Sequence, residues 1–321
     1  MGKHQRIKVK PPLVRYNLLE NIKITEFYVQ RRQFLSSLLA SVASLLVLPV
    51  TEAKAQPLVL GIFPRRNIKL THKLFTPLAR YLSQQLGRDV IIETSKSFDD
   101  FWTNVKQRRY DIVHFNQYHY IVSHQYYGYD AIAVNKELGS ATIAGSLIVR
   151  KDSGINEISD LRGKTILFGG GRSAMQSYIS ATWLLRQGGL NAGDYVEKFA
   201  INPPNTIIST YFKRADASGS GDVVMQLDNV RQRIDISQLK YLAKTKPMVH
   251  LPWAVKNNLS DELKDKLKML LTTLNNNDEG KKILNLASLD ALVSVQDSDF
   301  NAHRKIVTDI YGDDYGISSM E

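Results

Sequence analysis

Three consecutive glycines, Gly169–Gly171, stand between a run of strand-forming residues and a helical pattern. The run Lys164–Phe168 predicts a strand, and we expect the helix to begin at Arg172 and Ser173. A glycine turn that leads into a helix gathers unpaired N–H groups and the positive end of the helix dipole, which favours a bound anion. Arg172 would then clamp the anion. The alternative is an ordinary turn, with Ser173 as the N-cap and Arg172 in solvent.

Polar residues gather at three further predicted turns. Phe63 to Arg66, with Arg65 between them, follow the first strand, and Asn116-Gln117-Tyr118 follow a strand at Asp111. The segment Ala217–Asp222 is predicted to be a turn, and it carries Ser218, Ser220 and Asp222. Hydroxyls, amides and arginines donate hydrogen bonds to an oxyanion, whereas Asp222 would accept from a cationic substituent or serve only as a turn residue.

The chain lacks the sequence patterns of common catalytic sites. It contains no nucleophile elbow, P-loop or HExxH zinc motif, and no spacing singles out an acid/base pair. His114, His119 and His124 are five residues apart, a spacing that does not place them on one helix face. Cysteine is absent, which excludes disulfides and thiolate chemistry. The sequence therefore predicts a binding protein that is not an enzyme and holds no metal or cofactor.

The positive charge is concentrated near the N-terminus. The 321 residues carry a net charge of +11, and residues 1–55, with nine Lys/Arg and three Asp/Glu, supply +6 of it. The remaining +5 is spread along the chain without a long basic run, so nucleic acid is not an expected partner. A mild positive field suits a small anionic ligand.

Residues 1–55 have the three parts of a secretory signal peptide. Arg31 and Arg32 precede an apolar stretch from Leu35 to Val50, and a small-x-small end follows at residues 53–55. Arg-Arg-x-Phe-Leu also resembles the twin-arginine export signal. The alternative is a membrane anchor, but an uncharged run of about 17 residues with several serines is short for a spanning helix. We therefore expect a leader cleaved after Ala55 and a soluble periplasmic protein without a lipid anchor.

Strand and helix patterns alternate along the rest of the chain. Strands are expected at 57–62, 90–92, 111–115, 131–134 and 164–168, and helices at 74–86, 98–109, 118–127 and 206–214. This alternation predicts an α/β fold with a mostly parallel sheet, covered by helices on both faces, and a ligand beyond the carboxyl ends of the strands. The C-terminal part, with helices expected at 257–274, 281–286 and 300–311, is predicted to have no strand of its own.

Six short segments, taken together, resemble a known family. They are Leu60-Gly61-Ile62, Phe75–Leu82, Tyr110–Val113, Val149–Ile155, Asp160–Lys164 and Phe168-Gly169. In this order and spacing the chain resembles the substrate-binding proteins of phosphate, phosphite and phosphonate ABC importers, which have the type II periplasmic-binding fold. The resemblance implies two lobes with a ligand cleft between them. Residues 56–142 plus 249–321 would form one lobe, and residues 143–248 the other.

The resemblance also indicates where a ligand would bind. The family's turn after the Phe-Gly strand presents hydroxyl groups to the phosphonate oxygens, but here only Ser173 remains, followed by Ala174 and Met175. The loop after Asp111 is Asn116-Gln117-Tyr118 instead of Gly-Pro-aromatic. The candidate ligand-binding residues are Phe63, Arg65, Asn116, Gln117, Tyr118, Ser146, Gly171, Arg172, Ser173, Ala174, Gln176, Ser218, Ser220 and Asp222.

These observations predict a monomeric extracytoplasmic solute-binding protein. It would capture a small oxyanion of the phosphate, phosphite or phosphonate type by lobe closure and deliver it to the membrane permease of an ABC importer. Two alternatives stay open. One is a ligand-sensing module for a sensor kinase or chemoreceptor. The other is a binder of a non-phosphorus metabolite such as a sulfonate, suggested by the missing hydroxyls at Ala174 and Met175.

Overall fold

The computed structural model describes residues 55–64, 66 and 68–317, which belong to one compact unit. The expected leader, apart from Ala55, and the candidate Arg65 lie outside the described residues. Within the described part of the chain, no helix combines the length and the apolar character needed to cross a bilayer.

The first sheet combines strands from the two ends of the described chain. Its order is β13-β4-β12-β3-β1-β2. The strands are β1 (Leu58–Ile62), β2 (Val90–Thr94), β3 (Ile112–His114), β4 (Tyr129–Lys136), β12 (Pro252–Lys256) and β13 (Ala291–Ser294). β1 runs parallel to β2 and β3, whereas β12 is antiparallel to β3 and β4, and β13 is antiparallel to β4.

The second sheet is built from the middle of the chain, in the order β10-β6-β9-β7-β8. Its strands are β6 (Gly145–Arg150), β7 (Thr165–Gly169), β8 (Val196–Ala200), β9 (Ala217–Gly221) and β10 (Leu239–Lys244). β7 is parallel to β8 and β9, and β6 is antiparallel to β9 and β10. A small ribbon of β5 (Thr142–Ile143) and β11 (Met248–Val249) lies where the chain passes between the two sheets.

Three sequence predictions about strands are wrong. The sheets are mixed rather than mostly parallel, because the strands next to the crossings between the sheets run antiparallel to their neighbours. The C-terminal part contributes a strand, β13, which pairs with β4. The segment Ala217–Gly221 is not a turn but a central strand, paired on both sides.

Helices cover both faces of the first sheet. Those on one face are α2 (Ile68–Leu86), α8 (Asp261–Thr272) and α9 (Asp278–Leu286), and those on the other are α3 (Phe98–Lys106), α4 (Gln117–Tyr127) and α10 (Asn301–Tyr311). Strand β1 shows why: Leu58 and Leu60 belong to the core under α2, with Phe75 and Leu82, whereas Val59 packs against the core on the opposite face. This alternation follows from the two-residue period of a strand.

The second sheet is covered in the same way. α6 (Pro203–Tyr211) and α7 (Asp228–Arg231) lie on one face, and the π-helical segment η2 (Met175–Ile179) with α5 (Ser180–Gln187) lies on the other. The described residues also form five 3₁₀ turns: η1 (Ile158–Leu161), η3 (Asp222–Gln226), η4 (Ile236–Gln238), η5 (Leu274–Asn276) and η6 (Asp297–Phe300).

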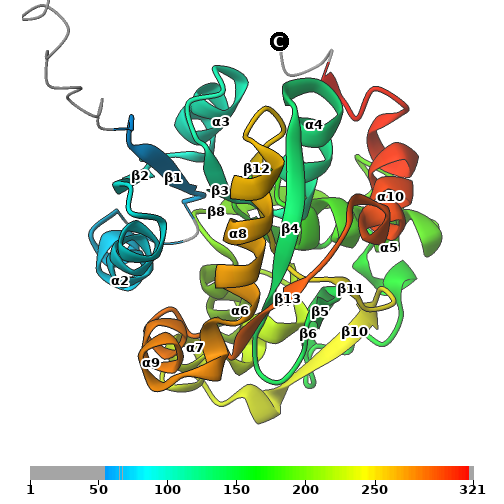
Figure 1. Ribbon diagram of the computed structural model, residues 1–321. Coiled ribbons are helices and arrows are strands. Elements are labelled where there is room, and N and C mark those ends of the chain that lie inside the picture. Colours follow the sequence, from blue (N-terminus) through cyan, green and yellow to red (C-terminus); the bar gives the residue numbers. More distant parts are fainter. Residues whose placement is uncertain (1–54, 65, 67, 318–321) are drawn as a thin grey trace, which may run out of the picture. The chain divides into compact units, whose positions relative to one another are not determined.

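Helix α10 links the two halves. It contacts α4, which covers the first sheet, and α5, which covers the second, and Figure 1 shows it in red beside α5. The Trp183 indole N–H donates to the Asp309 carboxylate at 2.9 Å, and Arg186 donates to the Asp309 carbonyl at 2.9 Å. These bonds place the last helix against the layer that carries η2, which matters for the site described next.

Candidate ligand-binding site

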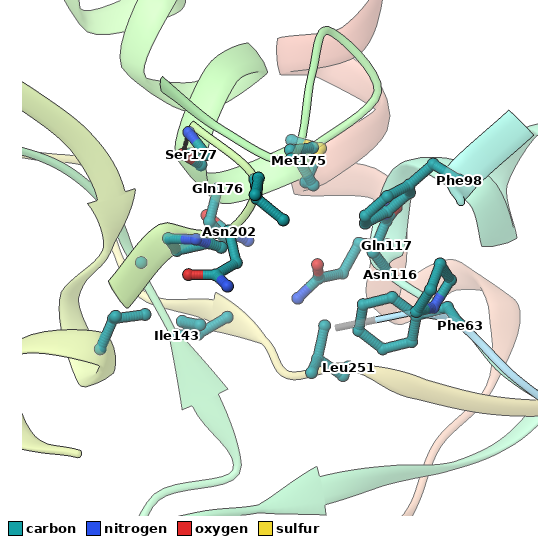
Figure 2. Close-up of a pocket in the computed structure, with 18 residues that line it drawn as sticks. Phe63, Phe98, Asn116, Gln117, Ile143, Met175, Gln176, Ser177, Asn202 and Leu251 are labelled. Carbon is teal, nitrogen blue, oxygen red and sulfur yellow. Dashed lines mark hydrogen bonds between the residues drawn. The ribbon is translucent and has the colours of Figure 1, made fainter. Parts of the chain in front are cut away.

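A cavity of about 80 Å³ lies where strand ends of both sheets meet the first turns of α4, η2 and α6. Figure 2 shows Asn116 and Gln117 on one side of it, and Gln176 and Asn202 on the opposite side. The lining residues are Phe63, Pro64, Phe98, Asn116, Gln117, Ile143, Gly169, Gly170, Ala174, Met175, Gln176, Ser177, Ile201, Asn202, Pro203, Gly221, Val224 and Leu251. None of these side chains carries a charge.

Helix α4 starts at the cavity because Asn116 caps it. The Asn116 Oδ1 accepts from the backbone N–H of His119 at 2.9 Å, which satisfies one of the unpaired N–H groups of the first turn. The Asn116 Nδ2 donates across the cavity to the carbonyl of Ser173 at 3.2 Å. One side chain thus fixes the start of α4 and also joins the loop after β3 to the loop after β7.

Segment η2 presents its first N–H groups at the cavity without a side-chain cap. The backbone N–H groups of Met175, Gln176 and Ser177 have no protein acceptor among the described residues. The Ser177 Oγ accepts from the Gly169 N–H at 2.6 Å and donates to the Gly219 carbonyl at 2.7 Å, which ties η2 to β7 and β9. Because η2 continues directly into α5, the positive end of this longer helix points at the cavity.

Helix α6 contributes its dipole but few donors. Its N-cap Asn202 accepts from the N–H of Asn205 at 3.2 Å, and the next two residues, Pro203 and Pro204, have no N–H at all. The helix can lie this close to β7 because position 169 is glycine. A Cβ atom built on Gly169 would lie 2.5 Å from the Pro203 nitrogen, which is too close for any other residue.

The rest of the wall is apolar, and its histidine neighbours are neutral. Phe63 and Phe98 pack edge-to-face with their ring centroids 6.2 Å apart. Burial lowers the pKa of His119, which lies behind Phe98, to about 3. Burial also lowers the pKa of His303 to about 3, and its Nε2 lies 3.1 Å from the Gln176 Nε2. Neither imidazole therefore supplies a positive charge near neutral pH.

Five of the residues proposed from the sequence line the cavity: Phe63, Asn116, Gln117, Ala174 and Gln176. They come from strand ends or helix starts of both halves of the chain. The structure therefore brings together residues that are more than a hundred positions apart in the sequence.

The residues after the glycine turn lie elsewhere. Arg172 does not line the cavity: it pairs with Glu197, donates to the Tyr178 hydroxyl at 2.6 Å and is 65% exposed. Gly171 is also outside the lining. Ser173 is not the N-cap, because the helix begins at Met175, and it meets the site only through the carbonyl that accepts from Asn116.

Five other candidates are held inside the layers instead of at the cavity. The Tyr118 hydroxyl donates to the Tyr315 carbonyl at 2.8 Å, and Ser146 donates to the Ser220 carbonyl at 2.9 Å. Ser218 and Ser220 are fully buried in β9. The Asp222 carboxylate accepts from the Ala144 N–H at 3.0 Å. Their neighbours Gly221 and Val224 do line the cavity.

Sequence reasoning missed several lining residues, among them Phe98, Met175, Ser177, Asn202 and Leu251. Phe98 follows β2, a strand that the sequence predicts, so the rule that ligands bind beyond strand ends would have found it, whereas Asn202 follows β8, which the sequence does not predict. Asn202-Pro203 is also a helix-start signal. No group of three or more metal-ligating side chains occurs among the residues that the structure describes.

Comparison with known proteins identifies the family. The sequence profile of the periplasmic substrate-binding proteins of phosphonate ABC transporters matches residues 60–300. Among solved structures, a phosphonate-transporter binding protein from Pseudomonas aeruginosa is similar, with 18% identity over 78% of this chain and 85% of that chain and a TM-score of 0.68. PhnD1 from Prochlorococcus marinus, in complex with methylphosphonate, has 18% identity over 80% of this chain and 99% of that chain and a TM-score of 0.69.

The fold also extends to a second ligand class. The aliphatic sulphonate binding protein SsuA from Escherichia coli has 12% identity over 80% of this chain and 91% of that chain, with a TM-score of 0.58. At identities this low, the structural similarity shows the shared fold alone. It is the type II periplasmic-binding fold, in which two lobes enclose the ligand cleft. Because the family profile spans most of the chain, this protein belongs to the periplasmic substrate-binding proteins of phosphonate ABC transporters, and it is a solute-binding protein of an ABC importer rather than an enzyme.

Proposed function

We propose that the protein binds a phosphonate with a short alkyl substituent and carries it to the permease of its importer. The observation that carries the proposal is that α4 and the η2–α5 helix begin at one cavity, whose described lining residues are all uncharged. Helix N-termini bind anions through unpaired N–H groups and the positive end of the dipole.

The phosphonate oxygens bind at the start of η2. The N–H groups of Met175, Gln176 and Ser177 are the donors, and the amide of Asn202 lies on the same side of the cavity (Figure 2). Among the described residues the lining contains no lysine or arginine, so the N–H groups and the helix dipoles are the described groups that stabilise the negative charge. The attraction between such groups and an anion is stronger in a cavity from which water is excluded, because the local dielectric constant is lower there.

The alkyl substituent fits the apolar side. Phe63, Phe98 and Leu251 form this wall. One water position needs about 10–15 Å³ of cavity volume. A cavity of about 80 Å³ therefore accommodates about five to eight non-hydrogen atoms, and methylphosphonate has about five.

Closure of the two lobes accompanies binding. The residues that hold the anion follow strands of the second sheet, whereas Asn116, Gln117 and Phe63 follow strands of the first. The proposed division, residues 56–142 plus 249–321 against residues 143–248, places the cavity at the lobe boundary. A ligand that contacts both sides binds the closed state more tightly and shifts the population toward it.

Isothermal titration calorimetry with methylphosphonate, ethylphosphonate, phosphite and phosphate tests the proposal. We expect methylphosphonate to bind with a Kd of about 1 µM or lower, with a decrease in the radius of gyration by small-angle scattering. Phenylphosphonate, with about ten non-hydrogen atoms against the about five to eight that the cavity accommodates, serves as the control and should not bind. Absence of binding for every phosphorus oxyanion at millimolar concentration would contradict the proposed function.

We propose further that the protein is exported as a soluble monomer after removal of residues 1–55. The support is the order of Arg31-Arg32, apolar run and small-x-small end, together with the absence of a cysteine that a lipid could modify. Protein purified from the periplasmic fraction is expected to begin at Gln56 by N-terminal sequencing. A start at Met1 in that fraction would show that the leader is retained.

A further inference from the structure

Gln117, which lines the cavity, carries a side-chain acceptor that has no donor among the described residues. The side chain is completely buried and lines the cavity from the first turn of α4 (Figure 2). Its Nε2 donates to the Val249 carbonyl at 3.2 Å, and a carbonyl can only accept, so the orientation of the amide is fixed. The Oε1 atom has no donor among the described residues.

The other polar side chains of the lining have their acceptors occupied. The Asn116 Oδ1 accepts from His119, and the Asn202 Oδ1 accepts from Asn205. The Gln176 Oε1 accepts from the Ser180 hydroxyl at 3.3 Å, and the Ser177 Oγ accepts from Gly169. A buried acceptor without a donor is unfavourable, so Gln117 requires a donor from whatever fills the cavity.

We propose that the Gln117 Oε1 accepts a hydrogen bond from a P–O–H group and thereby selects singly protonated phosphonates over sulfonates. The inference rests on the proposed function and names the ligand class of that same site. The second pKa of a phosphoryl group is about 6, so the dianion binds one proton near that pH and a monoanion with one O–H is present near neutral pH. A sulfonate is fully ionised there and has three oxygens that only accept.

The discrimination follows from what each ligand places against Gln117. A phosphonate monoanion donates its O–H to the Oε1 while its other oxygens accept from the N–H groups of η2. A sulfonate sets an anionic oxygen against the lone pairs of the Oε1, which repels the ligand and leaves the acceptor unsatisfied. The described lining favours the monoanion as well, because none of its residues carries a positive charge that would balance the second charge of a dianion.

Ethylphosphonate and ethanesulfonate test the inference, since they share the same substituent and differ at the head group. We expect calorimetry on the wild-type protein to give at least a 50-fold preference for ethylphosphonate. Gln117→Met retains the size of the side chain without the oxygen, and we expect the preference to fall below fivefold. Gln117→Asn is a second variant, in which the amide lies one methylene further from the ligand. We expect its preference for ethylphosphonate to fall as well.

Gln176→Met is the matched control on the opposite side of the cavity. Its amide is already bonded to His303 and Ser180, so the ratio of the two affinities should stay within threefold of wild type even if both affinities fall. Thermal melting confirms that each variant is folded.

Each outcome bears on one of the two proposals. Wild-type protein that binds neither ligand contradicts the proposed function. Wild-type protein that binds both equally overturns the present inference and leaves the proposed function intact. A preference that survives in folded Gln117→Met removes Gln117 as its cause. If neither Gln117 variant folds, the wild-type ratio alone decides.

Discussion

Asn116→Asp is expected to abolish ligand binding while the N-cap of α4 is retained. Aspartate caps a helix as well as asparagine does, so the bond from the His119 N–H to the Oδ1 is retained. The substitution, however, places a negative charge in a lining whose described residues include no basic side chain. Two like charges about 4 Å apart at an effective dielectric constant of about 20 repel by about 4 kcal/mol, a factor of about 10³ in affinity.

Calorimetry with methylphosphonate at pH 8, where the introduced carboxyl is ionised, measures this loss. Asn116→Ser also caps the helix but adds no charge, and it removes only the bond to the Ser173 carbonyl, so we expect about a tenfold loss for it. Arg172→Ala is the control for a residue outside the cavity. The Arg172 guanidinium pairs with Glu197 there, so the affinity of this variant for methylphosphonate should equal that of the wild-type protein. Binding by Asn116→Asp at wild-type strength would show that the anion lies elsewhere.

The part of the site that the sequence predicts lies at ends of buried strands. Asn116, Gln117 and Phe63 follow strands whose apolar residues are unambiguous, and the carboxyl ends of such strands meet at one edge of the sheet. Asn202 was missed because β8, with the sequence Val-Glu-Lys-Phe-Ala, is a largely exposed edge strand without a strong apolar pattern. When a strand is not recognised in the sequence, the turn at its carboxyl end is not recognised as a candidate site either.

The direction of a long side chain is not visible in a sequence. Arg172 stands beside the glycine turn as expected, but Glu197 on the neighbouring strand and the rings of Tyr178 and Phe199 draw the guanidinium away from the cavity. The contact partner lies 25 residues further along the chain. Its position depends on strand pairing, which the local pattern around Arg172 does not determine.

Strand β9 shows how packing overrides a local pattern. The segment Ala217–Gly221 consists of small residues that are typical of loops, yet it is a fully buried central strand. A Cβ atom on Gly219 would lie 2.1 Å from the Ser177 carbonyl oxygen. The small residues are therefore what allows η2 to approach the sheet closely enough to bring its N–H groups to the cavity.

Acidification from pH 7 to pH 5 is expected to lower the free energy of unfolding by about 4 kcal/mol through His119 and His303. Both side chains are buried, and burial lowers the pKa of each to about 3. In the unfolded chain a histidine has a pKa of about 6.5. As the pH falls below that value the unfolded state binds protons first, so the stabilisation present above about pH 6.5 is lost by about 1.4 kcal/mol per pH unit for each histidine.

His119→Phe separates this effect from general acid denaturation. The imidazole stacks on Trp102 with ring centroids 5.0 Å apart and contacts Phe98 and Phe101, so a phenyl ring suits the same aromatic surroundings. Urea unfolding at pH 7 and pH 5 measures the free energy of unfolding at each pH. Between pH 7 and pH 5 the free energy of unfolding of the variant should fall by about 2 kcal/mol less than that of wild type. The reason is that residue 119 of the variant binds no proton in the unfolded state. An equal loss in both proteins would mean that His119 is already protonated in the folded state or stays neutral in the unfolded one.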